Sequence, residues 1–200
     1  MNKFDEIAKR WDAEQSRINL AKNIFKAIRK KVALDNKMDI ADIGAGTGLL
    51  MMQFVPFVKS ITGYDNSEGM LNELGEKIKI QKCKQCKLKN FNANTDELPE
   101  DRYDLIISSM TFHHIIDIER FAKVIYKSLK AGGKFAVGDL ETEDGSFHSE
   151  NTSVEHHGFN PETFIKYFEK AGFKEAKAER IFVNKKNDKE FPVFLAYGEK

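Results

Sequence analysis

The sequence predicts a doubly wound α/β fold: a seven-stranded, mainly parallel sheet that ends in an antiparallel hairpin. Strand-like and helix-like segments alternate up to residue 140, which is typical of a parallel sheet covered on both faces. A glycine-rich turn at 44–48 follows the first strand and opens a helical segment. The last two apolar segments are separated only by residues 184–189, and so short a connection requires antiparallel pairing.

Composition limits the protein class. The 200 residues predict a single domain, and 41% hydrophobic content supports a core. Because 32 basic residues face 31 acidic ones, a globally basic nucleic-acid binder is disfavoured. No apolar run approaches the ~18 residues that span a bilayer, the charged start differs from a signal peptide, and two cysteines cannot build a disulfide framework. We therefore expect a cytoplasmic protein.

The first 140 residues supply the alternating elements. Ser16 can cap a helix with a regularly spaced apolar face up to Val32, and the apolar segment 49–57 predicts a helix that Pro56 ends or bends. Strands are predicted at 39–43, 60–64, 88–92, 103–109 and 135–140, with further helices at 67–78 and 118–129.

The last third of the chain has a different order. Asn160 followed by Pro161 predicts a helix start, because Asn is a good cap and Pro suits the first helical position. Segments 176–183 and 191–197 form the predicted hairpin. Pro192 must lie at a strand start or on an edge, since it cannot donate to a ladder.

The glycine turn and Asp65 indicate a nucleoside ligand. Glycines after a first strand let the backbone turn tightly and approach a ligand. The dinucleotide fingerprint GxGxxG is not met, because Gly48 comes one position early and Leu49 holds its place. Asp65 ends the second strand about 20 residues on, where a carboxylate can accept both ribose hydroxyls. Nicotinamide and S-adenosylmethionine sites share this feature.

Four segments together resemble a known family: DIGAGTG, GYDNSEGML, DELPEDRYDLIISSMTFHHI and LKAGGKFAVGDL, in this order and spacing. They are similar to the class I S-adenosylmethionine-dependent methyltransferases, and closest to the small-molecule branch that includes quinone-biosynthesis C-methyltransferases. The resemblance covers essentially the whole chain. It implies a Rossmann-like fold, S-adenosyl-L-methionine as the cofactor and methyl transfer as the activity.

The resemblance also assigns residues to parts of the cofactor. Gly44, Gly46 and Gly48 would surround the methionine part, and Asp42 would orient this loop and the cofactor's amino group. Asp65 would hold the ribose.

The adenine would lie near Asn66 and Met70, whose polarizable thioether suits a π-face. The family commonly has an acidic residue and a small neighbour after the third strand, whereas this chain has Asn92-Ala93-Asn94. An amide can still accept from the adenine amine, and either asparagine could be the equivalent.

Two further regions follow from the resemblance. The backbone of Ser108 and Ser109, at the end of the fourth strand, would face the methionine part and the reacting methyl. Trp11 and Arg17 belong to an N-terminal helical lid, residues 1–32, that would fold over the cofactor; the alternative is a helix that packs Trp11 on the core.

Histidines are the candidate catalytic residues. Methyl transfer is an in-line displacement that needs alignment and, for an acidic acceptor, a base. His113 and His114 follow the fourth strand, near the edge where α/β folds bind ligands, and His148 lies in the predicted substrate loop, residues 139–160. Each could instead bond a backbone carbonyl and shape the site.

A metal is the second possibility for this loop, since Asp139, Glu141 and the histidines could ligate a divalent ion. No HxxxH or HExxH spacing supports one, so we predict no metal and a solvated acidic loop.

The predicted partner is a small-molecule methyl acceptor, with no nucleic acid and no membrane. A nicotinamide oxidoreductase is disfavoured by the position of Gly48 and by the C-terminal hairpin, and a non-catalytic cofactor-binding subunit by the intact glycine loop. The fourth strand ends in Ser-Ser-Met-Thr, unlike the Asn/Asp-Pro-Pro-aromatic motif of enzymes that methylate DNA amines.

The near-zero net charge hides two opposite runs. Residues 77–95 hold six lysines and no acids, while 139–157 hold six acids and no lysine or arginine. The acidic run modestly favours a neutral or cationic acceptor. Cys83 and Cys86 form a lone CxxC, expected to be an inert connector between helix and strand.

Overall fold

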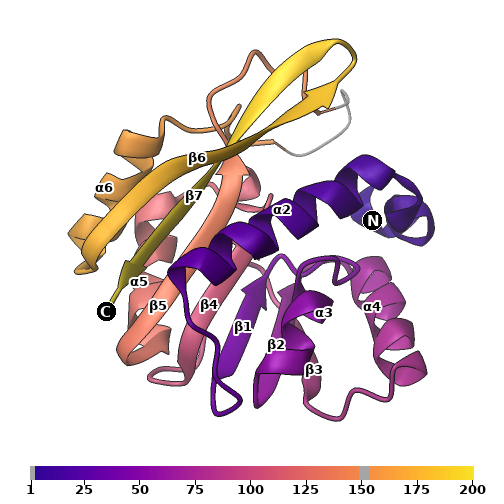
Figure 1. Ribbon diagram of the computed structural model, residues 1–200, viewed down its shortest axis with the longest axis vertical. Helices are drawn as coiled ribbons and strands as arrows, with labels where there is room; N and C mark the ends of the chain where they lie inside the picture. Colours follow the sequence, from indigo (N-terminus) through magenta and orange to yellow (C-terminus); the bar gives the residue numbers. More distant parts are fainter. Residues whose placement is uncertain (1–2, 149–153) are drawn as a thin grey trace.

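The computed structural model describes residues 3–148 and 154–200, and it has the predicted seven-stranded sheet (Figure 1). The strand order is β3-β2-β1-β4-β5-β7-β6, with β7 antiparallel to both neighbours. The strands are β1 (Asp39–Ile43), β2 (Ser60–Asp65), β3 (Cys86–Asn90), β4 (Tyr103–Ser109), β5 (Leu129–Leu140), β6 (Lys174–Lys186) and β7 (Lys189–Glu199).

The strand order reverses beside β1, which pairs in parallel with β2 on one side and β4 on the other. Loops that leave the carboxyl ends of β1 and β4 therefore diverge to opposite sides of the sheet. Such a switch point opens a crevice in which doubly wound folds bind ligands.

Helices cover both faces of the sheet (Figure 1). One core cluster packs α2 and α3 against the sheet, and the other packs α5 and α6 against its opposite face. The helical elements are α1 (Lys3–Ile7), η1 (Ala8–Ala13), α2 (Gln15–Lys31), α3 (Met51–Phe54), η2 (Val55–Phe57), α4 (Glu68–Ile80), η3 (Phe112–His114), α5 (Ile118–Ser128) and α6 (Pro161–Ala171).

Helix starts agree only partly with the sequence analysis. The Asn160 side chain caps α6 by accepting from the Thr163 amide, as predicted, and Ser67 does the same for α4. The prediction that Ser16 caps α2 is wrong, because the helix already begins at Gln15. The predicted helix over 49–57 is a four-residue α3 that passes into a 3₁₀ turn at Pro56, whose missing N–H prevents an α-helical bond there.

The strand after α4 begins two residues earlier than predicted. β3 pairs with β2 from Cys86–Ile61 to Asn90–Asp65. A disulfide joins Cys83 to Cys86 across the connector between α4 and β3. The connector lies where expected, but a lone CxxC gave no reason to predict the bond.

The C-terminal hairpin has a tighter turn than predicted. β6 and β7 extend to Lys186 and from Lys189, and only Asn187 and Asp188 turn, both with positive φ, as in two-residue hairpins. β5 pairs with β7 only as far as Leu140–Val193, so Pro192 lies at a local edge, as its missing donor requires.

Among the described residues, no helix combines the length and the apolar character needed to cross a membrane.

Candidate functional site

A cavity of about 820 Å³ lies at the carboxyl ends of β1, β2 and β4. The glycine loop, the N-terminal segment and the three histidines all line it. Most of the predicted site residues line it: Trp11, Arg17, Asp42, Gly44, Gly46, Asp65, Asn66, Met70, Asn92, Ala93, Asn94, Ser109, His113, His114 and His148.

Gly48 and Ser108 are not among the residues that line the cavity. A side chain at Gly48 would lie 2.3 Å from Leu74 Cδ1, so this glycine allows the loop to pack against α4. Ser108 is fully buried, and its Oγ donates to the Ile43 carbonyl at 2.8 Å. Both residues therefore pack against elements next to the cavity, Gly48 against α4 and Ser108 against β1.

The glycine loop exposes its backbone to the cavity. Gly44 and Gly46 both have positive φ, and the amides of Gly44 and Ala45 donate to the Tyr64 carbonyl at 2.8 and 3.0 Å. A Cβ at Gly44 would lie 2.1 Å from Thr111 Oγ1, whereas one at Gly46 would meet nothing within 4 Å. A ligand can therefore approach the backbone at Gly46.

Two carboxyl groups face this loop. Asp42 is almost fully buried, and neither of its oxygens has a hydrogen-bond partner among the described residues. Burial and the nearby charge of Asp65 raise the pKa of Asp42 well above its usual value. Burial also raises the pKa of Asp65, although its oxygens accept from the Gly46 amide at 2.7 Å and the Ser67 amide at 2.9 Å. The arrangement fits a ligand that brings hydroxyl and ammonium donors.

The two candidate asparagines both have structural partners. Asn94 Oδ1 accepts from the Ile116 amide at 2.8 Å, which ties it to the loop after η3. Asn92 Oδ1 accepts from the Asn94 amide at 3.0 Å. Neither contact decides which amide would meet an adenine.

Two aspartates anchor the N-terminal segment, residues 3–13, which lines the cavity. Asp5 accepts from Ser67 Oγ at 2.6 Å and from the Gly69 amide at 2.9 Å. Asp12 accepts from Thr47 Oγ1 at 2.5 Å and pairs with Lys77.

Trp11 and Arg17 form a further contact within the N-terminal segment. The Arg17 guanidinium lies 3.8 Å from the centre of the Trp11 ring, and both side chains line the cavity.

The three candidate histidines lie together. The ring of His113 is 4.2 Å from that of His114 and 4.5 Å from that of His148, centre to centre. His113 is only 1% exposed, and the Nε2 atoms of His113 and His148 have no hydrogen-bond partner among the described residues. Burial, together with the charges of His113 and His114, lowers the pKa of His148 to about 3.

Asp139, at the end of β5, holds His113. Its Oδ1 lies 2.7 Å from His113 Nδ1 and also accepts from the Leu140 amide at 2.7 Å, while Oδ2 accepts from the Phe112 amide at 2.9 Å. Burial alone would raise the pKa of Asp139, but the charge and hydrogen bond of His113 outweigh it and lower the pKa. The carboxyl group of Asp139 is thus surrounded by His113 and two backbone amides.

Within residues 3–148 and 154–200, no three His, Cys, Asp or Glu side chains are grouped to hold a metal ion. Asp139 contacts His113 and accepts two backbone amides. Glu141 accepts two hydrogen bonds from Arg180, at 2.7 and 2.5 Å. The prediction that no metal is used stays a prediction.

The predicted substrate loop is hydrogen-bonded to the β6–β7 hairpin. Its residues 149–153 lie outside the described part. Lys189 Nζ donates to Asp144 at 2.8 Å, and Lys186 Nζ donates to the Phe147 carbonyl at 2.6 Å.

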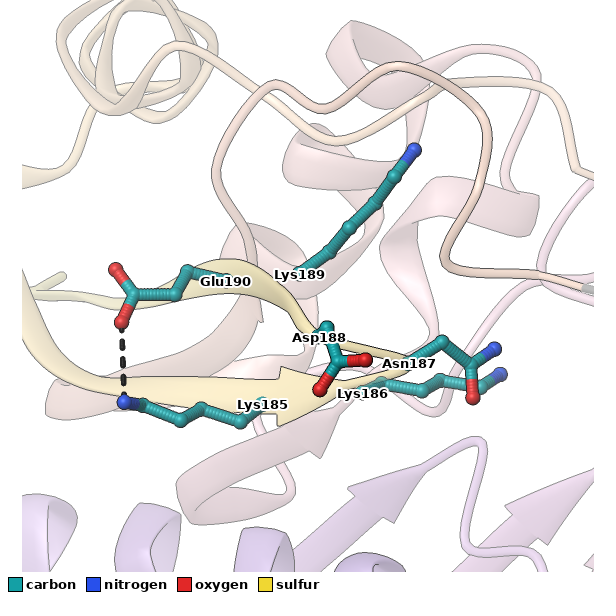
Figure 2. A pocket seen from close by; sticks show the side chains of 6 residues that line it. All are labelled: Lys185, Lys186, Asn187, Asp188, Lys189 and Glu190. Atoms are coloured by element: carbon teal, nitrogen blue, oxygen red, sulfur yellow. Dashed lines mark ion pairs between the residues drawn. The ribbon is translucent and has the colours of Figure 1, made fainter.

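The hairpin tip encloses a small hollow of its own, in which Lys185 pairs with Glu190 (Figure 2). The charges of Glu141 and Asp144 are thus balanced by cations from the hairpin. The acidic run therefore gives little basis for preferring a cationic acceptor.

Sequence analysis missed several residues of the cavity. Thr111 and the hairpin from Asn184 to Asn187 line it, and no motif marks these positions, since they reach the cavity only through the fold. Phe4 lies within the predicted lid, and Phe147 and Glu155 lie within the predicted substrate loop, although none is an individual candidate there. The sequence predicts Asp139 as part of the substrate loop and as a possible metal ligand but not as the partner of His113, because that contact depends on the pairing of β4 with β5.

Comparisons with known proteins identify similar methyltransferases. A family model described as a methyltransferase domain matches residues 41–137. An uncharacterised methyltransferase of Schizosaccharomyces pombe is 32% identical over 70% of this chain and 55% of its own length. The chloroplastic 2-methyl-6-phytyl-1,4-hydroquinone methyltransferase of Arabidopsis thaliana is 28% identical over 72% of this chain and 42% of its own. The chain spans about half the length of the curated relatives it matches.

The fold is shared with solved enzymes. An S-adenosylmethionine-dependent methyltransferase from Aquifex aeolicus superposes with a TM-score of 0.76 at 19% identity, covering 98% of this chain and 97% of the other. The matched residues 41–137 contain the glycine loop, Asp65 and the histidine pair. The chain is thus similar to methyltransferases in sequence and shares the fold of S-adenosylmethionine-dependent methyltransferases.

Proposed function

We propose that this protein transfers the methyl group of S-adenosylmethionine to a small-molecule acceptor by in-line displacement. The observation that carries the proposal is one cavity with two kinds of wall: the glycine loop with two buried carboxyl groups, and the histidines. S-adenosylmethionine supplies an electrophilic methyl group on a positively charged sulfur.

The chain's own residues would bind the cofactor as the family pattern implies. Asp65 would accept from the ribose hydroxyls, and Asp42, which lacks a partner, would take a donor from the methionine part directly or through the loop. The backbone at Gly46 is open to the ligand. Met70 and one of the two asparagines would face the adenine.

Residues 1–32 would act as a lid and residues 139–160 as the acceptor wall of a single methyltransferase domain. The fastened N-terminal segment supports the first assignment, and the position of His148 and Phe147 on the cavity supports the second. Excluding water protects the in-line reaction from competing solvent. The cytoplasmic location stays a prediction.

A small acceptor is supported by the cavity volume and by the relatives. About 820 Å³ is within the range of small-molecule sites. One relative bears the name of a hydroquinone methyltransferase, and we infer an acceptor of comparable chemistry here.

The proposal is tested by following S-adenosylhomocysteine release over a panel of phenols, thiols, amines and acidic carbon compounds. We expect release with at least one class, and its loss in Asp65→Ala. Cofactor binding without release on any class would contradict the proposal.

A further inference from the structure

His113 is held as an oriented base. Both oxygens of Asp139 accept backbone amide hydrogens, from Phe112 and Leu140, so His113 Nδ1, at 2.7 Å from Oδ1, is the donor of this pair. The remaining nitrogen, Nε2, is then a lone-pair acceptor. This atom is buried and has no partner among the described residues, and the His113 side chain belongs to the cavity lining.

His148 adds a second imidazole that stays uncharged. Its ring lies 4.5 Å from that of His113, and its Nε2 also has no partner among the described residues. Burial and the neighbouring histidines lower its pKa to about 3. A neutral imidazole can donate one hydrogen bond, and it does not repel a proton that arrives on its neighbour.

The loop that carries His148 is held in place. Phe147 packs edge-on against Phe191 of β7 at 5.0 Å between ring centres. Lys186 donates to the Phe147 carbonyl, and Lys189 donates to Asp144 and to Ser146 Oγ at 3.0 Å. Residues of the hairpin thus fix the distance between the two imidazoles.

We propose that the acceptor's acidic hydroxyl binds between His113 Nε2, which takes its proton, and His148 Nε2, which donates a hydrogen bond to the resulting oxyanion. Asp139 acts as the positioning residue of His113. This inference rests on the proposed function and adds the roles of three residues to it.

The proton and electrons balance in this step. The acceptor's O–H bond breaks, its proton moves to His113 Nε2, and the electron pair stays on the acceptor. That pair forms the new bond to the methyl carbon, either from the oxygen itself or from a ring carbon conjugated with it. The electrons of the C–S bond return to sulfur, and the proton on His113 later leaves to solvent.

The arrangement selects acceptors by acidity. An imidazole removes protons efficiently from phenols and enols, whereas aliphatic alcohols are too weakly acidic. The rings of Phe4 and His114 pack edge to face, 5.4 Å apart between centres, and both side chains line the cavity. We therefore expect a planar acceptor with an ionisable hydroxyl.

The test uses 4-nitrophenol, whose phenolate absorbs visibly and whose neutral form does not. The 200-residue chain is saturated with S-adenosylhomocysteine, and the probe is added one pH unit below its own pKa, where about one-tenth is ionised in solution. We expect the bound probe to be mostly phenolate, at least a tenfold rise in the ratio of ionised to neutral form. Bound probe that stays neutral, or no binding at all, would overturn the inference.

Variants separate the three roles. His113→Gln and Asp139→Asn should abolish the ionisation of the bound probe, while His148→Gln should reduce probe affinity about tenfold. His157→Gln, a half-exposed histidine outside the cavity, is the matched control and should change neither. Unchanged ionisation in His113→Gln would also overturn the inference.

Calorimetry with S-adenosylhomocysteine distinguishes the two proposals. Wild-type protein that binds S-adenosylhomocysteine but leaves the probe neutral keeps the proposed function and refutes the histidine roles. Failure of the wild type to bind S-adenosylhomocysteine refutes the proposed function itself. If His113→Gln fails to fold, the wild type, Asp139→Asn and His148→Gln still decide the result.

Discussion

Gly44 and Asp65 both determine the position of the glycine loop that lines the cavity. Gly44 has no room for a Cβ beside Thr111, and its φ of 68° disfavours any other residue. Asp65 joins the loop to the end of β2 through the Gly46 amide. Both residues were predicted from spacing alone, because a glycine turn followed by an acid about 20 residues later needs no knowledge of the fold.

Gly44→Ala should displace the loop. The added Cβ overlaps Thr111, so we expect the free energy of unfolding to fall by about 2 kcal/mol or more and S-adenosylhomocysteine affinity to fall more than about tenfold. Thermal unfolding and calorimetry measure the two effects. Gly75→Ala is the control: it lies in α4 with its nearest contact at 3.7 Å, so it should stabilise the protein by about 0.5–1 kcal/mol. Equal behaviour of the two variants would contradict this account.

Asp65→Asn should weaken cofactor binding without unfolding the protein. The amide keeps the shape and one acceptor but loses the charge, so we expect S-adenosylhomocysteine affinity to fall about 10- to 100-fold, as measured by calorimetry. The control Asp35→Asn changes an exposed aspartate that does not line the cavity, and this variant should bind S-adenosylhomocysteine as the wild type does. Normal affinity in Asp65→Asn would remove Asp65 from the site.

At the scale of elements, strands were predicted more reliably than the contacts between loops. Asn160 caps α6 as predicted, because a short polar side chain reaches back to the third helical amide. The same argument failed at Ser16, where α2 begins one residue earlier without a side-chain cap. The meeting of His113, Asp139 and His148 depends on three different loops, and no local pattern contains that information.

The N-terminal segment should control how fast the cofactor leaves. Asp12→Asn weakens the bond to Thr47 and the ion pair with Lys77, so we expect S-adenosylhomocysteine to dissociate about three- to tenfold faster, measured by stopped-flow displacement. The melting temperature should change little, because the segment covers the cavity rather than the core. Glu6→Gln, on the exposed side of α1, is the control. An unchanged dissociation rate in Asp12→Asn would argue against a lid.

The start of β1 contains an acid-sensitive cluster. Asp39 is buried; burial opposes its ionisation, but Ser60, Arg102 and Lys59 outweigh burial and hold the pKa of Asp39 well below its usual value. The carboxylate therefore stabilises the fold above about pH 4, the pKa of an unfolded aspartate, and this stabilisation is lost as the pH falls below it.

Asp39→Asn should lower the free energy of unfolding at pH 7 by about 1–3 kcal/mol, because three cations lose their partner. The difference from wild type should shrink between pH 4 and pH 2, as seen in urea unfolding. Asp101→Asn, whose ion pair with Lys200 is exposed on the aspartate side, should show a much smaller effect. A pH-independent difference would contradict the assignment to ionised Asp39.

At the scale of the whole molecule, the sequence predicted the class, the strand number and the antiparallel end, because hydrophobic periodicity and short connections restrict the topology. It did not predict how charge is distributed in space. The acidic run meets cations of the β6–β7 hairpin, which approach it only after the sheet has formed. The lysines of the basic run lie along α4 and the β3 edge, where lysines discourage pairing with other strands.

The same reasoning explains why the cofactor could be predicted more firmly than the acceptor. The glycine loop and Asp65 are neighbours along two adjacent parallel strands, whereas the acceptor wall combines residues from the N-terminal segment, η3, the loop after β5 and the hairpin.

The central claim is that the cavity binds S-adenosylmethionine and not a nicotinamide dinucleotide. Calorimetry with S-adenosylhomocysteine and with NAD, on the same 200-residue chain, tests it most directly. We expect one S-adenosylhomocysteine per chain to bind with measurable heat, and NAD to give none. Binding of NAD without S-adenosylhomocysteine would contradict the account.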